Sequence, residues 1–220
     1  MKVSPSVLAA PLSRLGEAVD KLDNSVVDYI HLDIMDGHFV PPLTFGEGTA
    51  KAIKNDSPIP LDVHLMVSQP QKEVPKYFPY KPEILTFHIE TTSFAIRLAQ
   101  SIKEQGIKAG ISLNPGTAIN TLRDVLPYVD VVLLMTVEPG YAGQKFLSNS
   151  YDRLKQLGQL RSEVEKEYGT SFLIEVDGGV TDQNVNNLKK AGVDIVVAGS
   201  FVFGSKDYNG QVNKLKEACK

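Results

Sequence analysis

The sequence predicts an α/β protein that forms a single (β/α)8 barrel over residues 1–220. A chain of 220 residues suits one domain of this size. Short apolar runs alternate eight times with longer amphipathic segments, and no linker or low-complexity tract interrupts them. An open, doubly wound sheet is the alternative. Its dinucleotide-binding form would need a Gly-x-Gly-x-x-Gly turn after the first strand, and residues 9–12 (Ala-Ala-Pro-Leu) lack one.

The predicted strands are short runs rich in β-branched and other apolar residues, which are typical of parallel strands covered by helices on their outer face. They are Val3–Leu8, Tyr29–Met35, Leu61–Val67, Ile84–Ile89, Ala109–Asn114, Val131–Val137, Leu173–Val176 and Ile195–Ala198.

The predicted helices are the amphipathic, Lys- and Glu-bearing stretches between these runs. They are Ser13–Leu22, Gly46–Lys54, Gln71–Tyr77, Phe94–Gln105, Thr117–Leu126, Asn149–Tyr168, Thr181–Ala191 and Gln211–Ala218. Gly106 and Gly192 follow helices where a left-handed residue is wanted, and Thr181 is a candidate N-cap.

Composition excludes several classes of protein. Hydrophobic residues make up 42% and charged residues 22%, which is ordinary globular usage rather than disorder. The net charge of −3 provides no global positive field for nucleic acid or an anionic membrane. The single cysteine, Cys219, excludes a disulfide framework. Without an apolar signal core or membrane span, the chain is expected to be cytoplasmic.

Side chains with metal-ligating chemistry occur at the carboxyl ends of three predicted strands, which meet at the catalytic face of a barrel. The two-residue period of a strand places the members of each group on one side. The second strand has His31, Asp33 and Met35 on one side and the third has Asp62, His64 and Met66, while the seventh ends in the run Glu175–Gly179, which contains Asp177. A single such residue is usually structural, but two imidazoles and two carboxylates would suit Zn²⁺, Fe²⁺, Mn²⁺ or Co²⁺.

Glycines follow the last three predicted strands, in loops that the barrel brings together. They lie in the segments 140–143, 178–179 and 199–200. Glycine lets backbone N–H groups approach an oxyanion closely, so these loops predict a phosphate site.

Seven segments resemble the ribulose-phosphate 3-epimerase family, in order from the first strand to the eighth. They are Ser4–Leu8, His31–Pro41, Asp62–Met66, Leu113–Pro115, Met135–Val137, Glu175–Val180 and Val197–Ser200. Members of that family are metal-dependent TIM barrels that interconvert D-ribulose 5-phosphate and D-xylulose 5-phosphate. The resemblance therefore implies a small-molecule ketose phosphate as partner, one divalent metal ion as cofactor, and a homo-oligomer.

The resemblance also implies roles for single residues. His31, Asp33, His64 and Asp177 would bind the metal, and Asp33 and Asp177 would be the acid/base pair. Substrate would contact Ser6, His64, Gly140, Tyr141, Ala142, Gly143, Gly178, Gly179, Gly199 and Ser200, while Met35, Met66 and Met135 line the site.

The expected chemistry also suits these residue types. Epimerisation removes a proton next to a ketone on one face and returns a proton on the other, which requires one base for each face. Asp33 and Asp177 come from different strands, and a divalent cation would stabilise the developing negative charge. Asp62 is expected to position an imidazole, and His88 and Glu90 to support the site or the fold without binding the metal.

Three departures from the family pattern leave alternatives open. The family commonly has Asn at the position of Pro42, Asn at that of Glu138 and Gly at that of Ala142. The acidic residue before Pro-Gly is more like the D-allulose 6-phosphate 3-epimerase branch, so a hexulose phosphate is an alternative substrate. A non-catalytic sugar-phosphate binding protein is less expected, because none of the predicted ligands is missing.

Overall fold

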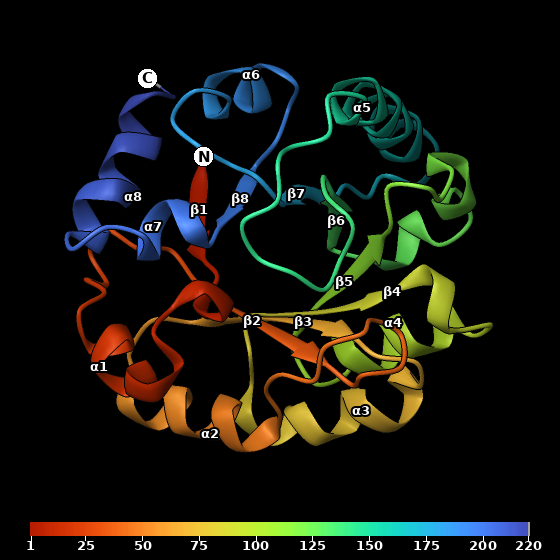
Figure 1. The fold of residues 1–220 in the computed structure, drawn as a ribbon. Coiled ribbons are helices and arrows are strands. Elements are labelled where there is room, and N and C mark those ends of the chain that lie inside the picture. The colour runs from red at the N-terminus through yellow and green to blue at the C-terminus, as the bar shows by residue number, and fades with distance from the viewer. Residues whose placement is uncertain (220) are drawn as a thin grey trace.

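Eight parallel strands form the wall of a barrel, and helices cover its outside (Figure 1). The computed structural model describes residues 1–219. The (β/α)8 TIM barrel that the sequence predicts is confirmed. The strands are β1 (Lys2–Pro5), β2 (Ile30–Met35), β3 (Leu61–Met66), β4 (Ile84–His88), β5 (Lys108–Leu113), β6 (Val131–Met135), β7 (Leu173–Asp177) and β8 (Ile195–Ala198).

Helices follow most of the strands and pack their apolar faces against the outside of the wall. They are α1 (Leu15–Asp20), α2 (Glu47–Asp56), α3 (Pro70–Tyr77), α4 (Ala95–Lys103), α5 (Ser150–Tyr168), α6 (Val185–Lys190), α7 (Ser200–Phe203) and α8 (Tyr208–Glu217). The four-residue helix α7, directly after β8, was not predicted. None of the helices in residues 1–219 is long and apolar enough to cross a membrane.

The sheet is almost closed into a ring. Its strand order is β1-β8-β7-β6-β5-β4-β3-β2. The two end strands meet through a single parallel bridge, Ser6 to His31, and through a hydrogen bond from Asp28 N to Val3 O of 3.2 Å. The seam between β1 and β2 is therefore the least extensively bonded part of the wall.

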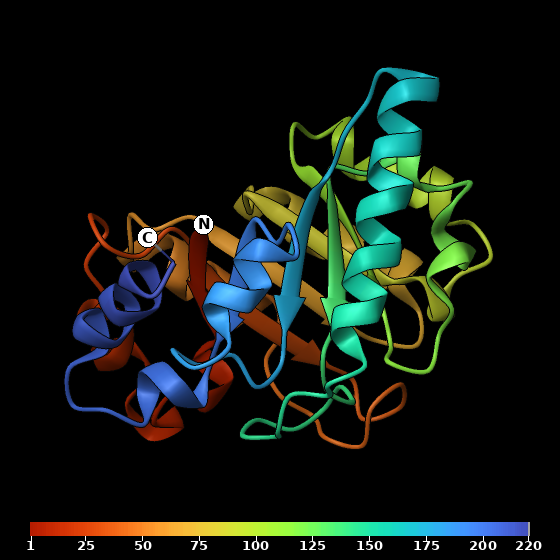
Figure 2. The ribbon, with the colours of Figure 1, turned by 90° about the horizontal axis from the view of Figure 1, so that it is seen from above.

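The register of β2 and β3 places the chemically active side chains beside one another. His31 pairs with Asp62, Asp33 with His64, and Met35 with Met66. The alternate residues of the two strands, Leu32, Ile34, Val63 and Leu65, pack in the large hydrophobic core under the helices. Because side chains alternate across a strand, the polar set faces the inside of the barrel. All strands end at the same end of the barrel, where long loops leave β2 and β6 (Figure 2).

The first strand is shorter than predicted. Residues expected in a strand to Leu8 instead form a turn of 3₁₀ helix, Val7–Ala9. The Ser6 hydroxyl accepts a hydrogen bond from Leu8 N at 3.4 Å, which is the behaviour of a capping serine. Such local capping favours a turn over continued strand at this point.

The helix predicted over Thr117–Leu126 is wrong. The structure has a 3₁₀ helix at Ile119–Leu122 and another at Leu126–Tyr128. Arg153 donates to the carbonyl of Thr117 at 2.9 Å, which occupies the acceptor that an α-helix would offer to Thr121 N. Thr121 N donates instead to Ala118 O, three residues back. A buried guanidinium thus replaces the α-helical pattern with a tighter one.

Helix ends were predicted with mixed success. Gly106 and Gly192 have φ angles of +72° and +88°, as expected of glycines that end helices. Thr181 is not the N-cap of α6, which begins at Val185. The Thr181 hydroxyl accepts from Gln183 N in the preceding turn, so the helix starts one turn later than predicted.

Candidate active site

A cavity opens at the carboxyl ends of the strands. Its walls come from β1, β2, β3, β6, β7 and β8 and the loops after them. Of the predicted site residues, it is lined by Ser6, Asp33, Met35, Met66, Met135, Gly140, Tyr141, Ala142, Gly143, Asp177, Gly178, Gly179, Gly199 and Ser200. His31 and His64 lie behind this surface and are fully buried.

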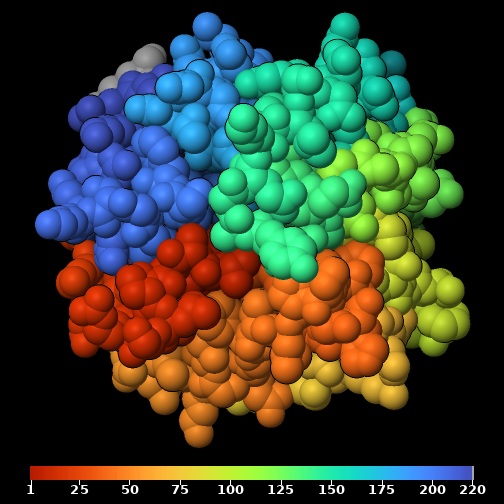
Figure 3. Space-filling view, in the orientation of Figure 1, coloured from red at the N-terminus to blue at the C-terminus, as the bar shows by residue number. Residues whose placement is uncertain are grey.

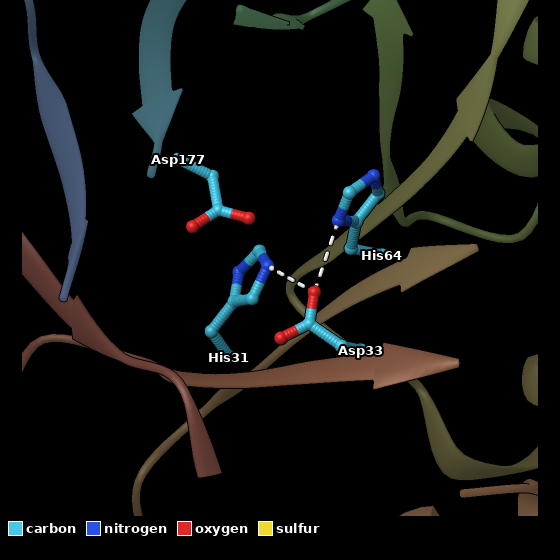
Figure 4. Close-up of side chains that lie close together, drawn as sticks. All are labelled: His31, Asp33, His64 and Asp177. Atoms are coloured by element: carbon cyan, nitrogen blue, oxygen red, sulfur yellow. Dashed lines mark hydrogen bonds and ion pairs between the residues drawn. The ribbon is translucent and has the colours of Figure 1, made fainter. Parts of the chain in front are cut away.

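The four predicted metal ligands converge at the floor of the cavity (Figure 4). One nitrogen or oxygen atom from each of His31, Asp33, His64 and Asp177 lies within 4.8 Å of the others. Asp33 Oδ1 is 3.3 Å from His31 Nε2 and 3.1 Å from His64 Nδ1. Asp177 extends from β7 and faces these three side chains across the barrel (Figure 4).

Hydrogen bonds from behind orient His31 and Asp33. Asp62 Oδ2 lies 2.6 Å from His31 Nδ1 and accepts from the Ser4 hydroxyl at 3.0 Å. Because a carboxylate only accepts, His31 carries a proton on Nδ1, and Nε2 faces the other ligands. Asp62 therefore positions an imidazole, as predicted. The Ser6 hydroxyl donates to Asp33 Oδ2 at 2.6 Å.

The residues present fit a divalent cation. His31 Nε2 is buried and has no hydrogen-bond partner among residues 1–219, although three other ligand-type groups surround it. Ligand atoms about 2 Å from one ion lie within about 4 Å of one another. The four candidate atoms, within 4.8 Å of one another, are close to that spacing. The set of two nitrogens and two carboxylates matches the preferences of Zn²⁺ and similar ions.

The two aspartates have opposite pKa shifts. Burial raises the pKa of Asp177 to about 7, and the nearby negative charges of Asp33 and Asp62 add to this shift. Burial also acts on Asp33, but in the absence of a cation the positive charge of His31 outweighs it and lowers the pKa of Asp33. At neutral pH, one carboxyl can thus hold a proton while the other is ionised.

Glu175 is a second acid on β7, beside the candidate metal ligands. It is fully buried below Asp177 on β7, and its carboxyl lies within 4.8 Å of Asp62 and His31. Burial and the charge of Asp62 raise its pKa, which favours its neutral form. The sequence did contain a signal, since residues two apart on a strand share a face.

Two glycines after β7 are required by close packing. A Cβ on Gly178 would lie 2.5 Å from Val137 Cγ2, and one on Gly179 would lie 2.4 Å from Phe146 N. Both also have positive φ angles, +121° and +66°. This glycine pair lets the loop after β6 pack directly against the turn after β7.

The three departures from the family pattern lie around the cavity, away from the ligand atoms. Glu138 and Ala142 line it. Pro42 is behind the wall, where its Cδ would be 3.4 Å from a Cβ on Gly140. The loops that carry these residues meet over the centre of this face, as orange and green atoms (Figure 3).

Comparison with known proteins identifies close relatives. Residues 2–203 match the Ribulose-phosphate 3 epimerase family. The chain is 40% identical over 214 residues to the ribulose-phosphate 3-epimerase of Aquifex aeolicus, which covers 97% of this chain and 95% of the relative. It is 39% identical to the ribulose-phosphate 3-epimerase of Escherichia coli, with 97% and 94% covered.

Solved structures with low sequence identity share the fold. A 3-hexulose-6-phosphate synthase from Salmonella typhimurium superposes with a TM-score of 0.70 at 20% identity, covering 100% of this chain and 98% of that one. An orotidine 5'-phosphate decarboxylase from Pyrococcus horikoshii gives 0.68 at 12% identity, with 99% and 98% covered. At these identities the likeness supports the barrel alone.

Proposed function

The chain belongs to the ribulose-phosphate 3-epimerase family and is an epimerase, and on this premise we propose that it interconverts D-ribulose 5-phosphate and D-xylulose 5-phosphate by proton transfer between two carboxyl groups. Asp33 would act on one face of the sugar at C3 and Asp177 on the other. The observation that carries this proposal is that the two aspartates line one cavity from different strands, with pKa values shifted in opposite directions.

The opposite shifts match what the reaction needs. An ionised Asp33 can remove the proton from C3 while a protonated Asp177 delivers one from the other side. After turnover the two groups have exchanged protonation states, which suits the reverse reaction. The hydrogen bond from Ser6 to Asp33 Oδ2 leaves Oδ1 directed toward the ligand cluster and holds the carboxylate in place.

The other lining residues would bind the substrate and exclude water. Backbone N–H groups near Gly178, Gly179, Gly199 and Ser200 suit the phosphate. The three glycines have no side chain to keep a ligand away from the backbone, and Ser200 lies at the start of the short helix α7. Met35, Met66 and Met135 add flexible apolar surface beside the reacting carbons.

His31, Asp33, His64 and Asp177 would hold one divalent cation. When bound, the cation would offset the negative charge that develops on the substrate oxygens as the proton leaves. Asp62 would keep the lone pair of His31 Nε2 pointed at that position through its bond to Nδ1. The neutral Glu175 beneath would keep a second negative charge away from Asp62.

The alternatives have less support. A hexulose phosphate substrate is not favoured, because the relatives described above are named for ribulose phosphate. Glu138 and Ala142 change the wall of the cavity but leave all four ligand positions intact. A binding protein without activity would have no need of two bases in one cavity.

Two isosteric substitutions test the acid/base pair. We expect Asp33→Asn and Asp177→Asn each to lower kcat with ribulose 5-phosphate by about 100-fold or more, because each removes one proton-transfer group. Asp152→Asn makes the same change on an exposed face of α5 and should retain wild-type activity. Near-normal turnover in either site variant would reject the two-base mechanism. Comparing kcat/KM for ribulose 5-phosphate and allulose 6-phosphate tests the substrate, and a preference for the latter would overturn our assignment.

A further inference from the structure

A row of three polar side chains extends from the ligand cluster to the rim of the barrel. His64 Nε2 lies 2.8 Å from His88 Nε2, and His88 Nδ1 lies 3.3 Å from Glu90 Oε2. Both imidazoles are fully buried, and their rings are stacked with centroids 5.0 Å apart. The row begins at Asp33 Oδ1, which is 3.1 Å from His64 Nδ1.

Glu90 is held in one orientation by the loop after β5. Its Oε1 accepts from Asn114 N at 2.7 Å and from the Thr117 hydroxyl at 2.5 Å. The other oxygen, Oε2, is therefore left for His88. Partial burial opposes ionisation, but the hydrogen bond with His88 and the two bonds to Oε1 stabilise the ionised form and lower the pKa of Glu90 to about 2.

Counting protons defines the state of the row. Three contacts need one hydrogen or one cation each: Asp33 with His64, His64 with His88, and His88 with Glu90. Two neutral imidazoles supply two protons. An ionised Glu90 takes the proton of His88 Nδ1, so His88 Nε2 must accept from His64 Nε2. His64 Nδ1 then has a free lone pair facing Asp33, and a cation completes the remaining contact.

We propose that Glu90 and His88 are positioning residues that fix the proton of His64 on Nε2, so that its Nδ1 lone pair faces the cation. The inference rests on the proposed metal site and extends it to two residues that do not bind the ion. Outer partners of this kind set the orientation and basicity of a ligating imidazole. His31 is oriented by the single carboxylate of Asp62, whereas His64 is oriented through a second imidazole.

The substitution Glu90→Gln tests this row of side chains, the relay from Glu90 through His88 to His64, without changing the shape of the side chain. The amide oxygen will remain with Asn114 N, which is a fixed donor, so the NH₂ group will face His88 Nδ1. That places a donor where the relay needs an acceptor, and the row then favours a proton on His64 Nδ1. We expect the dissociation constant for Zn²⁺, measured by calorimetry on the metal-free protein, to rise about 10–100-fold.

The control is Glu163→Gln, which makes the same change in an exposed ion pair with Arg123. It should bind Zn²⁺ as tightly as the wild type. In the Zn²⁺-loaded wild type, ¹⁵N spectra of the histidine rings should show the His64 proton on Nε2. This measurement needs no variant, so it remains decisive if Glu90→Gln does not fold.

Three results separate the possible failures. A wild-type protein that binds no Zn²⁺ would overturn the proposed metal site and the relay together. If the wild type binds Zn²⁺ and Glu90→Gln binds it with the same dissociation constant, the relay alone would be overturned. A His64 proton found on Nδ1 in the loaded wild type would also reject the relay.

Discussion

Buried charge dominates this protein at the scale of single residues. Asp33, Asp62 and Glu175 are almost completely buried, which is costly unless each charge is paired or neutralised. His31 lies between the first two, and burial raises the pKa of Glu175, which favours its neutral form. Each of these acids can be buried only because of its neighbours, so removing one partner raises the energetic cost of burying the others.

Asp36, at the start of the loop after β2, is closer to solvent, and its charge is also stabilised by neighbouring groups. Its carboxylate accepts from His38 N and Phe39 N at 2.8 and 2.9 Å. It also accepts from the backbone N and hydroxyl of Ser68, both at 2.7 Å. Although partial burial opposes the shift, these bonds lower the pKa of Asp36 to about 2.

The lowered pKa of Asp36 predicts a pH-dependent contribution to stability. Ionised Asp36 stabilises the fold above its unfolded pKa of 3.8, and this contribution is lost as the pH falls toward about 2. We expect Asp36→Asn to lower the free energy of unfolding by about 1 kcal/mol at neutral pH and by less at about pH 3. Urea unfolding at both pH values measures the difference, and a pH-independent effect would contradict the prediction.

At the scale of elements, strand spacing depends on which side chains share the barrel interior. Thr86 on β4 is paired with Gly110 on β5, and a Cβ on Gly110 would lie 2.0 Å from Thr86 Oγ1 and 2.9 Å from Thr86 Cβ. The glycine therefore serves packing rather than a turn. Small and large residues alternate across these two strands so that the interior can be filled.

We expect Gly110→Ala to destabilise the protein by about 1–3 kcal/mol, because the added methyl overpacks the interior. Adding Thr86→Ala should recover part of the loss, since it removes the closer of the two contacts. Gly158→Ala within α5 is the matched control, because its Cβ would meet nothing within 4 Å. There the same change should stabilise by about 0.5–1 kcal/mol. Equal effects at both positions in denaturant unfolding would refute the packing argument.

At the scale of the whole molecule, closure of the barrel creates the site. The candidate ligands come from β2, β3 and β7, and around the wall of the barrel β7 is separated from β2 by β8 and β1. A cation held by Asp33 and Asp177 would therefore connect strands on either side of the β1–β2 seam, which has a single bridge. Metal binding and stability of the whole barrel should be coupled.

This coupling predicts a rise in Tm with added metal. At a free Zn²⁺ concentration about 100 times the dissociation constant, the native state gains about 2.7 kcal/mol, or roughly 5–10 °C in Tm for a chain of this size. A chelator should reverse the shift, and Asp177→Asn should reduce it. A Tm that does not respond to Zn²⁺ would exclude the proposed site.

The amino-acid sequence alone predicted the fold class and named four candidate metal ligands, which the fold brings together. Alternating apolar runs predicted the barrel, and the two-residue period placed His31 and Asp33 on one face and His64 on the matching face of the next strand. The fold class needs only local periodicity and residue chemistry, whereas the choice of these four ligands over Asp62 also drew on the resemblance to the family. The strands and most helices accordingly lie where the sequence predicted them.

How these residues act on one another follows from the folded arrangement and not from the sequence pattern. The pKa shifts of Asp33 and Asp177, and the contact between His64 and His88, depend on strand register and on barrel closure. The 3₁₀ turns at Ile119–Leu122 depend on Arg153, which is distant in sequence. Electrostatic and hydrogen-bond energies change over a few ångströms between distant segments, and a local sequence pattern does not specify such distances.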